Sequence, residues 1–68
     1  MRFRLGDKVL FHKRNGHAQP LYPPIEGVVV RVHTNPFNQE TTMTIRSDGL
    51  LYMRLMDDRD IALIEDTK

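Results

Sequence analysis

The chain has 68 residues, so the sequence predicts one domain, residues 1–68, with a thin hydrophobic core. It contains no cysteine, which excludes disulfide bonds and thiolate metal sites and is typical of a protein of the reducing cytoplasm. The sequence has ten Lys and Arg residues and nine Asp and Glu residues, and this near-neutral balance argues against a protein that mainly coats nucleic acid. No apolar run approaches the roughly 20 residues that span a bilayer, so we expect no membrane partner.

The first third of the chain predicts one strand and one long loop. Residues 5–12 form the strand, which Gly6-Asp7 opens with a turn and in which Val9 and Phe11 point to the core. Residues 13–24 contain an Asn-Gly turn signal and three prolines, which fix φ and remove backbone donors. We therefore expect a loop there.

A second strand is predicted for residues 25–33. Its alternation assigns three valines to the core side, Val28, Val30 and Val32, and three other residues to the outside, Val29, Arg31 and His33. Residues 34–40 are polar, and their Asn-Pro signal predicts another loop.

Residues 41–55 alternate in polarity on both sides of Asp48-Gly49, which predicts a β-hairpin. A three-residue loop, 47–49, with Gly49 left-handed is the register we expect, because it pairs apolar residues on one face: Met43 with Met53 and Ile45 with Leu51. The opposite face would pair Thr44 with Tyr52 and Thr42 with Arg54. A two-residue loop would mix the two faces.

The last segment predicts a short turn and a short strand. Residues 56–60 suit one 3₁₀ turn capped by an aspartate, and residues 61–64 suit a fifth strand. The folded core then covers about residues 5–65, and residues 66–68 form a frayed tail.

Together these elements resemble the SH3-like small β-barrel of the KOW and Tudor-like group. The resemblance rests on Leu5-Gly6-Asp7-Lys8-Val9, Gly27-Val28-Val29-Val30, Asp48-Gly49 and the turn at 57–61. It implies an all-β fold of five strands closed into a barrel, with ligands held between the first loop and the 35–38 loop. It specifies the fold far better than the function.

Two groups of residues are candidates for binding. On the predicted outer side of the sheet, cations and an aromatic ring suit a nucleic-acid backbone and a stacked base: Arg31, His33, Arg46, Tyr52 and Arg54. In the two long loops the candidates are Lys13, Arg14, Tyr22 and Phe37. The alternative explanations are an ordinary solvated sheet face and aromatic rings that fix their loops to the core.

No residue pattern indicates catalysis or a cofactor. The three histidines lack the spacing of metal ligands, the aspartates at 57–60 lack the rest of an EF-hand loop, and Ser47 lies outside any nucleophile motif. The pore segment of plasmid-type dihydrofolate reductases, Val-Gln-Ile-Tyr, has no counterpart at residues 50–53. We therefore expect a protein that is not an enzyme and has no cofactor or metal.

The sequence leaves two functions open for this non-catalytic module. One is low-affinity binding of RNA or DNA by the basic and aromatic residues. The other is a protein-interaction adaptor or assembly subunit, which would use its long loops or a free strand edge. An apolar patch at Val29, Leu50 and Met56 would favour the second function and self-association.

Overall fold

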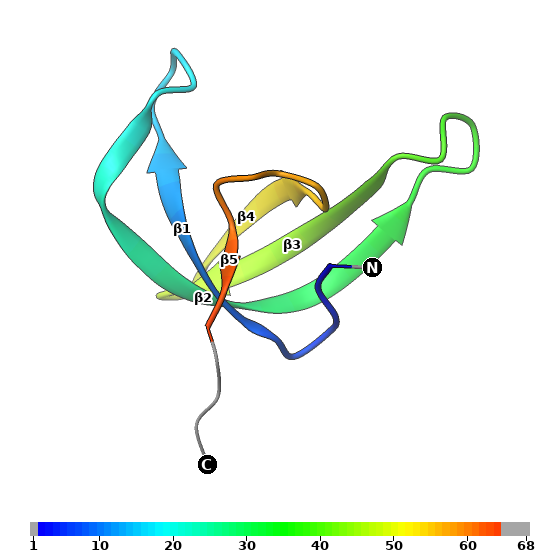
Figure 1. Ribbon diagram of the computed structural model, residues 1–68, viewed down its shortest axis with the longest axis horizontal. Coiled ribbons are helices and arrows are strands. Elements are labelled where there is room, and N and C mark those ends of the chain that lie inside the picture. The colour runs from blue at the N-terminus through cyan, green and yellow to red at the C-terminus, as the bar shows by residue number, and fades with distance from the viewer. Residues whose placement is uncertain (1, 65–68) are drawn as a thin grey trace.

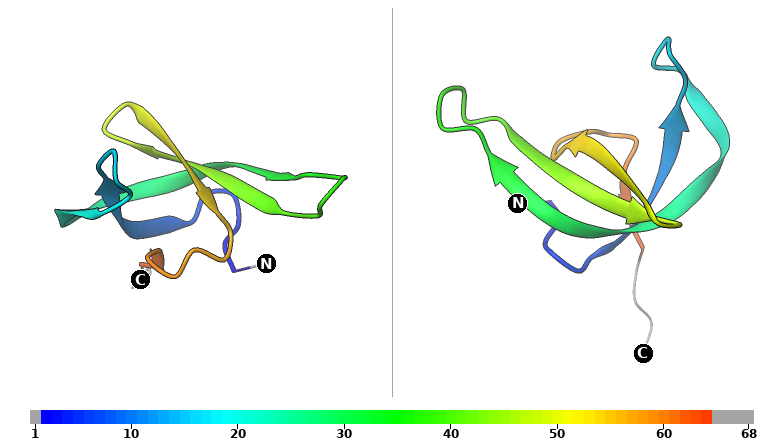
Figure 2. Two further views of the ribbon diagram at one scale, coloured as in Figure 1. Left: turned by 90° about the horizontal axis from the view of Figure 1, so that it is seen from above. Right: turned by 180° about the vertical axis from the view of Figure 1, so that it is seen from behind.

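The computed structural model describes residues 2–64, which form one antiparallel sheet of five strands without a helix (Figure 1). The strands are β1 (Lys8–Arg14), β2 (Pro20–Thr34), β3 (Thr41–Ser47), β4 (Leu50–Leu55) and β5 (Ala62–Leu63). They lie in the order β4-β3-β2-β1-β5. The all-β class is therefore confirmed. The sheet is strongly curved, but β4 and β5 are its two ends and do not pair with each other within residues 2–64, so closure into a barrel is not confirmed (Figure 2).

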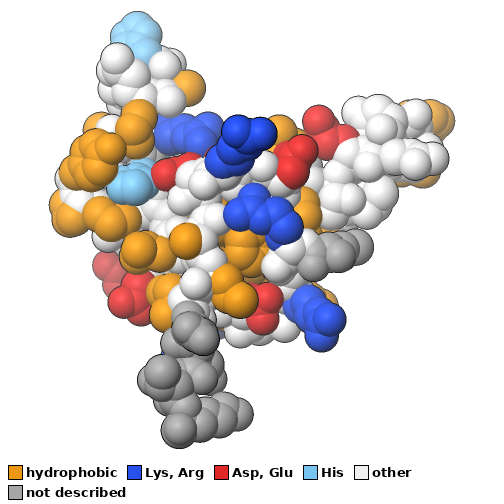
Figure 3. All heavy atoms as spheres, viewed as in Figure 1, with side chains coloured by type: hydrophobic (Ala, Val, Ile, Leu, Met, Phe, Trp, Pro, Cys, Tyr) orange, Lys and Arg blue, Asp and Glu red, His pale blue; other side chains and the backbone are white. Residues whose placement is uncertain are grey.

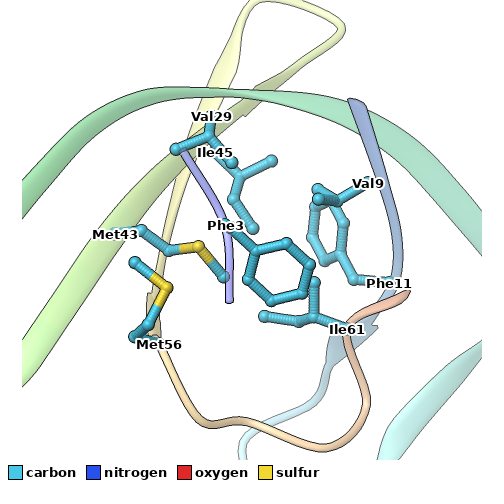
Figure 4. Close-up of a cluster of buried hydrophobic side chains, with 8 residues drawn as sticks. All are labelled: Phe3, Val9, Phe11, Val29, Met43, Ile45, Met56 and Ile61. Atoms are coloured by element: carbon cyan, nitrogen blue, oxygen red, sulfur yellow. The ribbon is translucent and has the colours of Figure 1, made fainter. Parts of the chain in front are cut away.

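The concave side of the sheet holds the core (Figure 4). β1 contributes Val9 and Phe11, as its alternation predicts. The segments before β1 and after β4 complete the core, which consists of Phe3, Val9, Phe11, Val29, Met43, Ile45, Met56 and Ile61. The connections of the chain therefore cover the inner side of the sheet, where a larger protein would place a second layer.

The loop expected at residues 13–24 is largely a strand. β1 continues to Arg14, β2 begins at Pro20, and the hairpin between them is closed by Asn15, whose Oδ1 accepts hydrogen bonds from the amides of His17 and Gln19. The prolines are tolerated because the β1–β2 register is interrupted around His12, so the missing amides of Pro23 and Pro24 cost no ladder hydrogen bond.

The expected alternation of β2 is wrong at its centre. Val29 is 1% exposed and belongs to the core, whereas Val30 is 38% exposed. The register with β3 shifts between Val29 and Arg31, so Val30 is the extra residue of a β-bulge. Because of the bulge, the residues before Val30 point to the sides opposite to those predicted. Arg31 and His33, which follow it, keep their predicted position on the convex side.

The hairpin forms over the expected residues, but its register is the one that we disfavoured. Ser47 pairs with Leu50, so the loop has two residues, and both have positive φ: 56° at Asp48 and 79° at Gly49. These values fit a type I′ turn, whose twist matches that of the strands. Ile45 therefore pairs with Tyr52, and Met43 pairs with Arg54.

The turn before β5 also differs from the expected 3₁₀ turn. The amide of Asp58 donates to the carbonyl of Leu55, and the amide of Ile61 donates to that of Asp58, so two separate turns follow each other. An aspartate does cap the second turn, because Oδ1 of Asp58 accepts from the amide of Asp60. The predicted tail at 66–68 lies outside the described residues.

Candidate functional site

The convex side of the β2-β3-β4 sheet, called the outer face here, carries three rows of paired residues. Directly paired residues of neighbouring strands share a face, so the pairings define the rows: Val28-Arg46-Leu51, Arg31-Thr44-Met53 and His33-Thr42-Leu55. Apart from Val28, polar and basic side chains lie on β2 and β3, and apolar side chains lie on β4. The outer face is therefore divided lengthwise into a polar half and an apolar half.

Three of the predicted binding residues lie together on this face: Arg31, His33 and Arg46. Arg31 and His33 line a shallow depression of about 180 Å³ with Thr42, Thr44 and Met53. Among the described residues, no carboxylate lies within ion-pair distance of Arg31 or Arg46. Their charges are consequently available to a ligand.

Tyr52 and Arg54 lie on the opposite, inner side, because the two-residue turn reverses the sides of β4. The Tyr52 ring meets the Phe11 ring edge-on at 5.3 Å between centroids. The Arg54 guanidinium lies over the same Phe11 ring, with Cζ 5.3 Å from its centroid, and Nη2 donates to the carbonyl of His12 at 2.7 Å. These two residues hold the fold together and do not extend the outer face.

Carboxylates of the turn before β5 compensate the buried arginine. Nη1 of Arg54 lies 3.8 Å from Oδ2 of Asp58 and 3.9 Å from Oδ2 of Asp60. Arg14 makes a two-oxygen contact with Asp58, at 3.1 and 3.0 Å. Two of the five predicted arginine and lysine ligands thus have internal acidic partners.

Asp60 also binds His12, through a ring nitrogen at 2.6 Å and a backbone amide at 2.9 Å. Burial raises the pKa of Asp60, but the hydrogen bonds from His12 and the charges of His12 and Arg14 outweigh it and hold that pKa below its ordinary value. The carboxylate is thus part of a structural network that joins β1, β4 and the turn. No hydroxyl or thiol nucleophile contacts this network among the described residues.

The loop candidates do not form one site. Tyr22 is 75% exposed and packs edge-on against His12, at 4.7 Å between ring centroids, beside Lys13 and Arg14 of the β1–β2 hairpin. Figure 3 shows hydrophobic side chains gathered at this hairpin and, next to them, basic and acidic side chains that alternate. The surface there is mixed in charge and not a basic patch.

Phe37 is 95% exposed at the tip of the β2–β3 loop. The loop is ordered by Asn35 and Asn38, whose side-chain oxygens accept from the amides of Phe37 and Glu40. Its tip and the tip of the β1–β2 hairpin point away from each other at opposite sides of the molecule (Figures 1 and 2). The two loops therefore do not form the shared ligand site that the resemblance implies.

The apolar half of the outer face was not anticipated. Leu51, Met53 and Leu55 are 65%, 71% and 41% exposed. Of the patch expected from the sequence, Leu50 is exposed, but Val29 and Met56 are buried. The alternation of β4 was the available signal, since its apolar residues recur at every second position; only the register shows which side they occupy.

Within residues 2–64, no group of three His, Asp or Glu side chains is arranged to hold a metal ion. The same residues include no helix long and apolar enough to cross a membrane. No protein-family model matches the chain, and neither a curated protein nor a solved structure matches it.

Proposed function

We propose that this protein is a non-catalytic module that binds a polypeptide along β4, as an interaction adaptor or assembly subunit. The observation that carries the proposal is that β4 ends the sheet and exposes Leu51, Met53 and Leu55 along its length. An added strand would satisfy the free backbone groups of β4, and the three apolar side chains would select its sequence.

The weak protection of the β4 edge supports this function. Natural sheet edges are commonly guarded by lysine, proline, a bulge or an inward charge, which prevent unwanted pairing. β4 has no lysine or proline, and its register with β3 is regular; its one inward charge, Arg54, is bound by the carbonyl of His12 and lies near the carboxylates of Asp58 and Asp60. An apolar edge guarded by one inward charge alone indicates a surface that is normally covered.

The SH3-like barrel also remains part of this proposal. Five antiparallel strands in a strongly curved sheet, with a tight hairpin between β3 and β4, support it. Phe37, on its ordered loop, and Tyr22 are further exposed aromatic anchors, of the kind that contribute most energy to protein interfaces. The cytoplasmic location stays a prediction.

Nucleic-acid binding is the second candidate function. It is favoured by the depression that Arg31 and His33 line and by the guanidinium of Arg46 on the same face, which has no carboxylate partner within residues 2–64. With Arg14 and Arg54 held in internal pairs, and a net charge of +1, we expect this binding to be weak and salt-sensitive.

A peptide selection separates the two functions. A phage-displayed library of random peptides is selected on the wild-type protein and counter-selected on Met53→Lys, a change at an exposed position that leaves the fold intact. We expect enriched peptides with alternating apolar residues, whose binding shifts the amide NMR signals of β4. Single-stranded DNA and RNA are titrated in parallel at low and high salt. Salt-sensitive shifts at Arg31 and Arg46, without any selected peptide, would replace the proposed function with nucleic-acid binding.

A further inference from the structure

We infer that the polypeptide bound along β4 is a second copy of this chain, paired antiparallel through β4 about a two-fold axis at Met53. The inference rests on the proposed function and names its partner. It follows from three properties of β4: the positions of its free backbone groups, the symmetry of its apolar residues and its lack of uncompensated charge.

The free backbone groups lie at the same residues as the exposed apolar side chains. Antiparallel pairs alternate between those that exchange hydrogen bonds and those that do not. The two-residue turn makes Ser47 and Leu50 a bonded pair, and the amide of Met56 donates to the carbonyl of Thr41 at 2.9 Å, so the alternation is fixed at both ends of β4. Leu50, Tyr52 and Arg54 consequently bond to β3, and Leu51, Met53 and Leu55 direct their backbone groups away from the sheet.

These outward groups are nearly all available. Among the hydrogen bonds of residues 2–64 outside the strand ladders, one involves them: the carbonyl of Leu55 accepts from the amide of Asp58. Both groups of Leu51 and Met53, and the amide of Leu55, have no partner within the described residues. An antiparallel strand whose outward backbone groups also lie at every second residue would form hydrogen bonds with these groups.

The β4 strand of a second copy has its outward backbone groups at the same alternate residues. In one register, each of its exposed apolar residues lies opposite an exposed apolar residue of the first copy. With Met53 opposite Met53 of the second copy, Leu51 lies opposite Leu55, and Leu55 lies opposite Leu51. Such a contact is isologous, as in most homodimers. A register displaced by two residues would place one leucine of each copy opposite a turn residue, so the Met53 register is the best of the available ones.

Charge does not oppose the pairing. The chain carries a net charge of +1, and Arg54 points to the inner side, where it would lie opposite Tyr52 of the second copy. Two copies can therefore approach along β4 without repulsion between unpaired like charges. The product is a continuous sheet of two outer faces, in which Arg31 and Arg46 of each copy flank a central apolar band.

The size of the contact predicts a weak dimer. A six-residue strand is about 20 Å long and a sheet is about 10 Å thick, so the edge presents roughly 200 Å². Stable complexes bury about 800 Å² on each partner. We therefore expect dissociation in the micromolar to millimolar range, and a test that traps the pair is more decisive than a test that requires high affinity.

Disulfide trapping supplies that test, because the natural chain has no cysteine. In a bonded antiparallel pair the two Cα atoms are about 5.5 Å apart, a distance that a disulfide spans. Met53→Cys should form a disulfide-linked dimer under mild oxidation. Leu51→Cys is the matched control, because Leu51 is 65% exposed and Met53 is 71% exposed. The symmetry mate of Leu51 would lie opposite Leu55, four positions along the strand and thus about 14 Å away, at about 3.4 Å per residue. Leu51→Cys mixed with Leu55→Cys should form a linked pair that neither forms alone.

The free equilibrium is measured by sedimentation of the wild type and Met53→Lys over a concentration series. We expect the wild type to dimerise and the variant to stay monomeric with an unchanged circular dichroism spectrum. Equal linking of Met53→Cys and Leu51→Cys, or species larger than a dimer, would overturn the inference; the latter would indicate head-to-tail pairing of β4 with β5. Peptide selection that succeeds while Met53→Cys stays monomeric would overturn self-pairing and leave the proposed function standing.

Discussion

Nδ1 of His12 lies 2.6 Å from Oδ1 of Asp60, so β1 is bound directly to the turn that precedes β5. The second carboxylate oxygen of Asp60 accepts from the backbone amide of His12 at 2.9 Å. One side chain thus holds both the ring and the backbone of His12 at the point where the β1–β2 ladder is interrupted. The aspartate supplies contacts that the strand loses there.

Replacing Asp60 should therefore destabilise the fold. Asp60→Asn keeps the size of the side chain but removes its charge, and we expect the free energy of unfolding to fall by about 1 to 2 kcal/mol. Chemical denaturation at pH 7 measures this change. Asp57→Asn is the control, because Asp57 is an exposed carboxylate of the same connection without a hydrogen bond to a described residue. An equal effect of both substitutions would refute the role of the His12 contact.

The stability of the wild type should fall in acid because of the same residue. Its pKa lies below the ordinary value of 3.8 in the folded protein, so folding favours the ionised form. A depressed pKa contributes stability above the unfolded value, and this stability is lost as the pH falls through the folded value. Denaturation at a series of pH values should show a steeper loss below about pH 3.8 in the wild type than in Asp60→Asn. Parallel profiles would contradict this account.

The β3–β4 turn requires a glycine at one position. Gly49 has a φ of +79°, a conformation that a Cβ atom disfavours, although no atom lies within 4 Å of the place where it would stand. Gly49→Ala should cost roughly 1 to 2 kcal/mol of stability through backbone strain alone. Gly16→Ala is the control, since Gly16 also lies in an open hairpin turn but without a left-handed φ. A thermal melt that is unchanged by Gly49→Ala would exclude the type I′ turn.

The sequence predicts the strands of this protein better than their registers. Asp48-Gly49 locates the hairpin because few residue pairs accept two positive φ angles, and Val9 and Phe11 locate the core side of β1. The bulge at Val30 could not be predicted, because an extra residue in a run of valines leaves no mark on the alternation. The prolines of β2 suggested a loop because a proline cannot donate a ladder hydrogen bond. The interruption of the β1–β2 ladder that accommodates them depends on the partner strand and cannot be read from the residues of β2 alone.

The binding residues were predicted unevenly for a related reason. Arg31, His33 and Arg46 share a face because each has its expected position in an outward row. Arg54 was expected beside them, because the three-residue loop would place it opposite Thr42 on the outer face. The two-residue turn places it on the inner side, where its charge is compensated by Asp58 and Asp60, which are near it only in the folded chain. Conversely, the exposure of Leu51 depends on the absence of a covering element among the described residues, and composition does not show that.

A pair of alanine substitutions tests the register on which the candidate surface depends. Ile45 is fully buried, whereas Leu51 is 65% exposed, although the expected three-residue loop would place them opposite each other on one apolar face. Ile45→Ala should lower the free energy of unfolding by about 2 to 5 kcal/mol, because it leaves a cavity in the core. Leu51→Ala should change it by less than about 0.5 kcal/mol when measured at low concentration, where the dimer is absent. A large loss of unfolding free energy in both variants would show that Leu51 is buried. The outer face would then have no apolar half, and a second copy could not bind there.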